Sequence, residues 1–176
     1  YSAIADAADI DQILYNVPSR TACDLLPSSV SVLSEHKNII GIKEAVDDKF
    51  RIKKLVQISL NSDSNFSVFS GDDPTFMDSL LLGTHGVISV SANVSPKSHS
   101  EICSAVRNGD YKKAQMLNEL NSNLYRLLFV ESNPIPVKWV LYKMNLIKNA
   151  IRLPLMELDE TFHEEMLSEM IKLRLI

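Results

Sequence analysis

The sequence predicts an α/β protein whose strands lie parallel in one sheet. Short apolar runs with strand character recur about every 20–28 residues, and a helical pattern follows each of them. This alternation is typical of a doubly wound sheet or of a (β/α)8 barrel. The 176-residue chain contains four such units, half the number in a closed barrel, and its last part reads as helix only.

Apolar patterns identify the strands, and residues that favour turns separate them. An alanine-rich segment, residues 2–8, reads as the end of a helix and leads into the first strand, which Pro18 stops. The three isoleucines of the second strand suit a strand that is buried on both faces, and an amphipathic helix follows it. Residues 61–65 read as a polar loop. The expected strands are residues 12–16, 38–43, 66–70 and 86–91, and the expected helices between them are residues 27–33, 47–60 and 74–82.

Capping residues set the expected ends of several helices. Asp73 is expected to be the N-cap of the third of these helices, with Pro74 at its first position and Gly83 after its end. Asp110 is expected to cap a helix in the second half of the chain. That half contains four expected helical segments, residues 96–107, 110–130, 134–146 and 160–174.

Composition excludes several classes of partner. The chain is 45% hydrophobic and 23% charged with a net charge of −4, so it lacks the basic surface that nucleic acid or an anionic membrane requires. No apolar run reaches the ~18 residues of a membrane-spanning helix, and no signal peptide is recognisable. The sequence begins with Tyr1, so we expect a processed chain or a piece of a longer protein.

Cysteine and histidine usage points to a cytoplasmic protein without a metal site. Cys23 and Cys103 lie far apart and read as two buried free thiols in a reducing compartment, with one disulfide as the alternative. The four histidines show no metal-ligand spacing, and the five glycines form no phosphate-binding loop. We therefore expect neither a metal nor a nucleotide cofactor.

Lys43 stands where the second expected strand gives way to a loop. A half-buried ammonium group loses solvation there, which lowers its pKa and leaves some free amine near neutral pH. A free amine at the end of a buried strand is a candidate Schiff-base nucleophile. The ordinary alternative is a lysine whose stem packs on the strand while its ammonium group reaches water.

Further candidates stand at the carboxyl ends of the other strands, where both α/β architectures place their active and ligand-binding residues. Neighbouring strands lie ~4.8 Å apart, so the phenol of Tyr15 is expected to meet the Lys43 amine over one small substrate and to carry protons. Arg20 suits a carboxylate ligand. Each residue has a structural alternative: a packed tyrosine, a solvated arginine, a loop ion pair for Glu44 and a helix cap for Asp73.

These residues, in this order, resemble one family. Residues 15–21 (YNVPSRT) and 41–45 (GIKEA) resemble the pyruvate-dependent class I aldolase family of dihydrodipicolinate synthase and N-acetylneuraminate lyase. Further motifs match in the same order, at residues 70–73 (SGDD), 86–93 (GVISVSAN) and 129–139 (FVESNPIPVKW). The resemblance covers essentially the whole chain.

The resemblance implies a (β/α)8 barrel with a C-terminal helical extension, of which this chain holds strands five to eight. Lys43 would form an imine with pyruvate, and Tyr15 would shuttle protons during imine formation and cyclisation. Arg20 would help to bind the carboxylate of aspartate semialdehyde, while Gly71 and Ile88 would line the site. The covalent imine would take the place of a cofactor.

The first four strands of the family barrel have no counterpart in this sequence. In the family they carry a pyruvate-carboxylate loop, a threonine pair and a tyrosine that reaches across a dimer interface. The expected division is a half barrel in residues 1–95, with its last helix continuing to about residue 107, and a helical part in residues 96–176. We expect an N-terminally truncated fragment that is inactive or barely active alone and forms a homodimer or homotetramer when complete.

Arg20 also indicates which branch of the family the chain resembles. It favours the branch that condenses pyruvate with L-aspartate 4-semialdehyde to 4-hydroxy-tetrahydrodipicolinate in lysine and diaminopimelate biosynthesis, because N-acetylneuraminate lyase-like members usually lack Ser-Arg at this place. A sugar-acid aldolase is the alternative within the family. A non-catalytic remnant or assembly subunit, which associates through residues 96–176, is the alternative outside enzymes.

Overall fold

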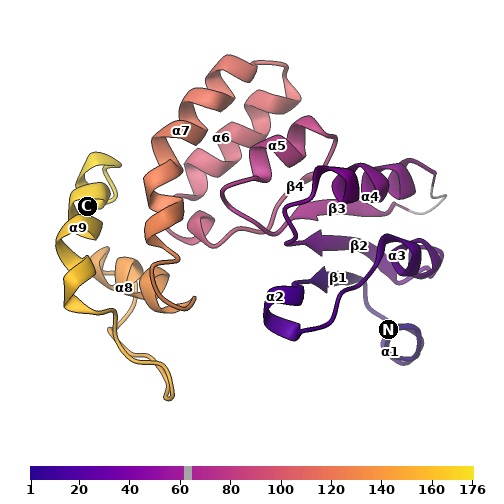
Figure 1. Ribbon diagram of the computed structural model, residues 1–176, viewed down its shortest axis with the longest axis horizontal. Coiled ribbons are helices and arrows are strands. Elements are labelled where there is room, and N and C mark those ends of the chain that lie inside the picture. Colours follow the sequence, from indigo (N-terminus) through magenta and orange to yellow (C-terminus); the bar gives the residue numbers. More distant parts are fainter. Residues whose placement is uncertain (62–64) are drawn as a thin grey trace. The chain divides into compact units, whose positions relative to one another are not determined.

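The structure is a computed structural model that describes residues 1–61 and 65–176. The chain divides into two compact units, Tyr1–Ile88 and Ser89–Ile176 (Figure 1). The first unit contains the sheet, and the second is built from helices. The boundary that the sequence placed after residue 95 lies inside the second unit. In the polar loop expected at residues 61–65, residues 62–64 lie outside the described part of the chain.

The first unit is an α/β layer with a parallel sheet, as the sequence predicted. Among the described residues the sheet has four strands in the order β1-β2-β3-β4, so each strand pairs with the next one in the sequence. The strands are β1 (Gln12–Asn16), β2 (Ile39–Glu44), β3 (Ser67–Ser70) and β4 (Gly86–Val87). The helices are α1 (Ser2–Ala7), α2 (Pro18–Thr21), α3 (Pro27–Leu33), α4 (Lys49–Asn61) and α5 (Phe76–Leu81).

The two faces of this sheet differ in their surroundings. Leu14, Ile42 and Val68 point from three neighbouring strands toward the helices and are at most 4% exposed. Each such aliphatic side chain contributes about 1.5–3 kcal/mol through burial. Alternation along a strand places Ile13 and Tyr15 on the opposite face, where they are 44% and 45% exposed. The core under the helices is formed by Ala5, Leu14, Val30, Ile39, Ile42, Leu55, Phe66 and Val68.

Two local expectations in the first unit are wrong. Helix α5 begins at Phe76, with Thr75 at its N-cap position, and not at Pro74 with Asp73 at the N-cap. Asp72 Oδ2 accepts hydrogen bonds from the Thr75 backbone N–H (3.2 Å) and hydroxyl (2.6 Å). Strand β4 is also shorter than expected. The Ser89 hydroxyl accepts from the backbone N–H of Ala92 (2.8 Å), and such a local bond favours a turn over continued strand pairing.

The second unit follows the expected helical order: α6 has the expected bounds, residues 96–107, and the other three helices are shorter than expected. Asp110 caps α7 as predicted, accepting from the Lys113 backbone N–H at 3.1 Å. Helix α8 ends before its expected limit, at a turn in which Asn145 has a left-handed φ of 59°. Trp139 stacks on His163 with ring centroids 4.6 Å apart. The elements are η1 (Ser91–Asn93), α6 (Pro96–Arg107), α7 (Tyr111–Leu127), α8 (Ile135–Lys143), η2 (Glu160–Phe162) and α9 (His163–Lys172).

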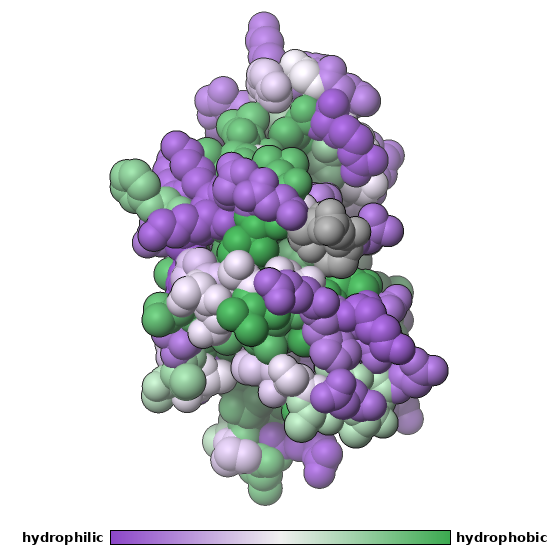
Figure 2. Space-filling view, turned by 90° about the vertical axis from the view of Figure 1, so that its right-hand side faces the viewer, coloured by the Kyte–Doolittle hydropathy of each residue, from purple (hydrophilic) through white to green (hydrophobic). Residues whose placement is uncertain are grey.

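Seen from the side of α3 and α4, the surface mixes hydrophilic and hydrophobic residues (Figure 2). Both cysteines are free, but Cys23 is exposed, so the expectation of burial is wrong for this residue. Within the described chain, no helix combines the length and the apolar character needed to cross a membrane.

A substitution at Gly41 tests whether stability depends on the close approach of β2 to β3. A Cβ at this position would lie 2.6 Å from the backbone oxygen of Ser67 on the neighbouring strand. We expect Gly41→Ala to lower the free energy of unfolding in urea by about 1–3 kcal/mol, because the backbones must separate. Gly86→Ala is the control, since its Cβ would meet Phe69 ring atoms at ordinary distances of 3.5 and 3.7 Å. Equal losses in the two variants would contradict this account.

Candidate active site

The site lies where the strands of the first unit end. The strands are parallel, so their carboxyl ends meet at one edge of the sheet, and α2 follows β1 at that edge (Figure 1). The sequence supplies polar side chains at this place: Tyr15 near the end of β1, Lys43 near the end of β2 and Arg20 on α2. The edge therefore collects the candidates that the sequence singled out.

Tyr15 and Lys43 face each other across the first strand pair. The two residues are directly opposite in the β1–β2 register. The Lys43 Nζ atom lies 4.3 Å from the centroid of the Tyr15 ring. The ring attracts the amine while it is protonated, and it also shields the amine from water. The amine of Lys43 therefore lies over the Tyr15 ring at the end of the first strand pair.

The environment of Lys43 favours the free amine. Burial is the largest influence, and it lowers the pKa of Lys43 because an ammonium group loses hydration there. The negative charge of Asp73 opposes this effect, and the positive charge of Arg20 adds to it. The net direction is a pKa below that of an ordinary lysine, which raises the fraction of nucleophilic amine at neutral pH.

Gly71 lies against the stem of Lys43. A Cβ on Gly71 would stand 2.9 Å from Lys43 Cε and 3.0 Å from Lys43 Cγ. The Gly71 backbone N–H donates to the carbonyl oxygen of Glu44 at 2.7 Å, which holds the loop after β3 against the end of β2. Glycine is therefore the residue that lets the lysine lie in this position without a clash.

Ile88 follows the short strand β4 at the same edge. Its backbone N–H donates to the carbonyl oxygen of Ser70 at 2.9 Å, and its side chain is partly exposed. The structure thus places all five predicted site residues in the first unit. The contacts described above join Tyr15, Lys43 and Gly71 directly, and the charge of Arg20 acts on the Lys43 amine.

Two carboxylates near the site have roles that the sequence did not reveal. Asp73 is buried, and its charge acts on Lys43. Glu44 is the last residue of β2, is 1% exposed and points away from Lys43 toward the helices. Strand alternation was the available signal: Glu44 shares its face with Ile42, so its charge had to be buried and therefore paired.

In segments 1–61 and 65–176, no three histidine, cysteine, aspartate or glutamate side chains are grouped so that they could hold a metal ion.

Comparison with known proteins places this geometry in one family. The sequence profile of the dihydrodipicolinate synthetase family matches residues 1–173. A 4-hydroxy-tetrahydrodipicolinate synthase from Pseudomonas syringae pv. syringae (strain B728a) is 52% identical over 164 residues, which are 93% of this chain and 55% of the relative. The chain thus spans about half the length of the curated relatives that it matches.

Solved structures agree with the sequence match. The dihydrodipicolinate synthase of Acinetobacter baumannii, solved in complex with pyruvate, superposes with a TM-score of 0.91 at 43% identity, over 100% of this chain and 60% of that chain. A dihydrodipicolinate synthase described as the first monomeric variant superposes with a TM-score of 0.96 at 36% identity, over 100% of this chain and 59% of that chain.

The pKa of Lys43 can be measured directly. After reductive methylation with ¹³C-formaldehyde, NMR titration follows each lysine separately, and the Lys43 signal is assigned with Lys43→Arg. We expect a pKa below that of Lys49, an exposed lysine whose pKa is raised by its bond to Asp78 (2.8 Å). Arg20→Gln should raise the pKa of Lys43, because a repelling charge is removed.

The opposite charge change gives the opposite sign. Asp73→Asn should lower the pKa of Lys43 further, because the carboxylate that stabilises the ammonium form is gone. The titration of Lys49 should stay unchanged in both variants. If Arg20→Gln and Asp73→Asn shift Lys43 in the same direction, the electrostatic account of this site is wrong.

Proposed function

The chain belongs to the dihydrodipicolinate synthetase family, and we propose that it carries the imine-forming part of a 4-hydroxy-tetrahydrodipicolinate synthase. This lyase would condense pyruvate with L-aspartate 4-semialdehyde in lysine and diaminopimelate biosynthesis. The observation that carries the proposal is the half-buried Lys43 amine, 4.3 Å from the Tyr15 ring centroid at the carboxyl edge of the sheet.

The chemistry follows from a free amine beside a phenol. The lone pair of Lys43 attacks the C2 carbonyl carbon of pyruvate, and the carbonyl oxygen leaves as water, which gives an imine. Tyr15 supplies a proton to the leaving oxygen and accepts one from the nitrogen. The protonated imine then draws electrons from the pyruvate methyl group. That carbon loses a proton and adds to the aldehyde carbon of the second substrate.

Arg20 accounts for the choice of the second substrate. A guanidinium group binds a carboxylate through two parallel hydrogen bonds, and aspartate semialdehyde carries a carboxylate. The amino group of the bound semialdehyde then displaces Lys43 from the imine carbon, which closes the ring and returns the lysine as free amine. A sugar aldehyde has no carboxylate at this place, so Arg20 favours the synthase over a sugar-acid aldolase.

We propose that the four strands form the second half of a (β/α)8 barrel, strands five to eight, and that the helices after residue 96 include its C-terminal extension. The solved synthases match over 59–60% of their length, which supports a part of the barrel rather than the whole of it. The exposed face with Ile13 and Tyr15 corresponds to the inside of such a barrel. The complementary half would cover this face and complete the substrate site.

The proposed function also implies a cofactor requirement, an oligomeric state and a compartment. We propose that no resident cofactor is required, because the imine on Lys43 provides the electron sink. The complete protein would be a cytoplasmic homodimer or homotetramer. One solved relative is a monomeric variant, so the oligomeric state is a separate measurement from the activity.

Borohydride trapping tests the function. Pyruvate and borohydride, added to the chain together with the polypeptide that precedes the matched region in a relative, should attach one reduced pyruvyl group to Lys43, as mass spectrometry of the peptides would show. Lys43→Ala should abolish the adduct with the fold intact by circular dichroism. Lys49→Ala, a change at an exposed lysine, should leave it unchanged.

Turnover separates the competing assignments. Condensation with aspartate semialdehyde should require the complementary polypeptide, and full turnover by the 176-residue chain alone would overturn the half-barrel proposal. Condensation with sugar aldehydes in place of the semialdehyde would favour a sugar-acid aldolase. No pyruvate adduct in the complemented protein would favour a non-catalytic assembly subunit.

Gly71 gives a second test of the same site. Gly71→Ala would set its Cβ 2.9 Å from Lys43 Cε and 3.1 Å from Ala45 Cβ, so the flexible lysine side chain has to move away and Ala45 has to shift slightly. A misplacement of the amine by about 1 Å costs up to about 10²-fold in rate, so we expect slower trapping of pyruvate with a small change in urea unfolding. Gly86→Ala is the matched control, and an equal loss of trapping in both variants would exclude the steric explanation.

A further inference from the structure

Four polar side chains, three of them buried and one exposed, form a clamp on the helix-facing side of the strand ends. The clamp consists of Asn16, Asp24, Glu44 and Arg51. The Asn16 amide nitrogen donates to both carboxylate oxygens of Glu44 (3.1 and 3.0 Å) and to Asp24 Oδ1 (2.9 Å). The Asn16 amide oxygen accepts from the backbone N–H of Leu25 at 2.9 Å.

Glu44 is the centre of the clamp. Its carboxylate also accepts from the Val46 backbone N–H (2.8 Å), and Arg51 Nε lies 3.5 Å from Oε2. Burial raises the pKa of Glu44 above its ordinary value, and the negative charge of Asp24 adds to the rise, while the hydrogen bonds of Asn16 and Val46 and the charge of Arg51 act against it. All the groups described around the two oxygens are donors, which suits the ionised carboxylate.

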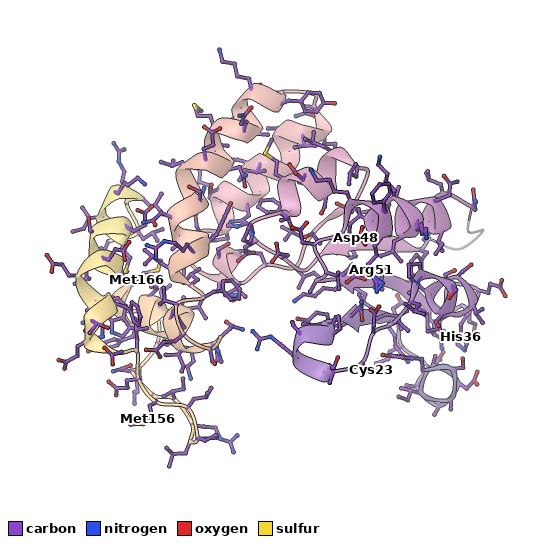
Figure 3. The ribbon with its side chains drawn as sticks, viewed as in Figure 1. Cys23, His36, Asp48, Arg51, Met156 and Met166 are labelled. Atoms are coloured by element: carbon purple, nitrogen blue, oxygen red, sulfur yellow. The ribbon has the colours of Figure 1, made fainter. Side chains whose placement is uncertain are left out.

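Arg51 connects the clamp to the loop after α2. Its Nη2 atom pairs with Asp24, and its side chain is 8% exposed. In Figure 3, Arg51 points from α4 toward the loop that carries Cys23. The hydrogen bond from Arg51 lowers the pKa of Asp24 most, and the hydrogen bond from the Asn16 amide lowers it further. The clamp thus joins β1, β2, α4 and the loop in one bonded group.

The clamp lies directly beside the Tyr15–Lys43 pair, on the other face of the sheet. Asn16 and Glu44 are opposite each other in the β1–β2 register, one residue beyond the Tyr15–Lys43 pair. Alternation puts the clamp on one face of the sheet and the chemical pair on the other. Asp24 and the Leu25 N–H close the loop that begins after β1, and α2 with Arg20 lies within this loop.

Stability alone is a weak reason for such a cluster. Buried ion pairs lose the hydration of every charge, and apolar residues of similar volume often stabilise a protein equally well. The preceding residues on the same face, Leu14 and Ile42, show that apolar packing is available here. What hydrogen bonds add to apolar packing is a fixed geometry.

We propose that the clamp positions the Tyr15–Lys43 pair and the Arg20 loop for imine chemistry, an inference that rests on the proposed function. Asn16 and Glu44 fix the ends of β1 and β2, so the amine stays against the phenol and partly out of water. Asp24 and Arg51 fix the far end of the loop, so the Arg20 charge stays near the amine. All four are positioning residues, because none of them touches the reacting atoms.

Glu44→Gln in the 176-residue chain is the primary test. It keeps the volume but sets an amide nitrogen against the donors of Asn16 and Val46. When the strand ends loosen, the Lys43 amine gains water, so its pKa in the ¹³C-methyl titration should rise by about 0.5 pH unit or more. Trapping of pyruvate in the complemented protein should slow about tenfold or more.

Glu169→Gln is the matched control. Glu169 is also buried, 4% exposed, and accepts from Asn123 (2.9 Å) and Lys172 (3.0 Å) in the second unit. It undergoes the same chemical change with similar burial, and it should leave the titration of Lys43 unchanged. Asp24→Ala serves if Glu44→Gln fails to fold, because Asp24 is 40% exposed and its loss frees the Arg20 loop.

The outcomes separate this inference from the function on which it rests. An unshifted Lys43 pKa and unchanged trapping in folded Glu44→Gln or Asp24→Ala chains would show that the clamp is only structural and would overturn the proposal. A shift of equal size in Glu169→Gln would do the same. A Lys43 pKa that rises in the clamp variants supports positioning even if the unsubstituted protein forms no pyruvate adduct, a result that would overturn the proposed function alone.

Discussion

The parallel register of β1 and β2 is the constraint on which the rest of the site depends. Residues opposite each other in a parallel pair keep their side chains on the same face, so one register sets both Tyr15 against Lys43 and Asn16 against Glu44. A slip by one residue would exchange the two faces: the amine would enter the core, and Glu44 would enter the solvent-facing side. The same hydrogen-bonded ladder therefore determines the fold and the chemistry.

The sequence predicted those parts of the structure that depend on local patterns. Strand positions, the lysine at a strand end and the Asp110 cap follow from alternation, burial and capping, each of which acts over a few residues. Asp73 shows where local reasoning fails. It is a suitable cap in isolation, but α5 has Thr75 at its N-cap position, and Asp73 is buried where its charge acts on Lys43, which lies far away in the sequence.

Glu44 and Arg51 show the second limit. The pattern of β2 indicates that a charge at Glu44 is buried, but no local pattern names its partner. The partners come from α4 and from the loop after α2, and only the tertiary arrangement brings these segments together. The strand pattern therefore indicates that Glu44 needs a partner, and contacts between segments far apart in the sequence provide it. The same long-range contacts act on α4: the apolar side chain of Phe50 is exposed, while the charged side chain of Arg51 is buried beside Asp24 and Glu44.

The two faces of the strand ends divide the work of the site. On the open face, a lysine must be dry enough to lose its proton and still reachable by a substrate, so tight packing cannot hold it in place. The restraint has to come from the backbone, and the backbone is held from the other face, where water is excluded and hydrogen bonds are strong. A half-exposed nucleophile above a fully bonded buried carboxylate is the arrangement that satisfies both requirements. In the proposed function, the buried Glu44 is what keeps Lys43 in position to react.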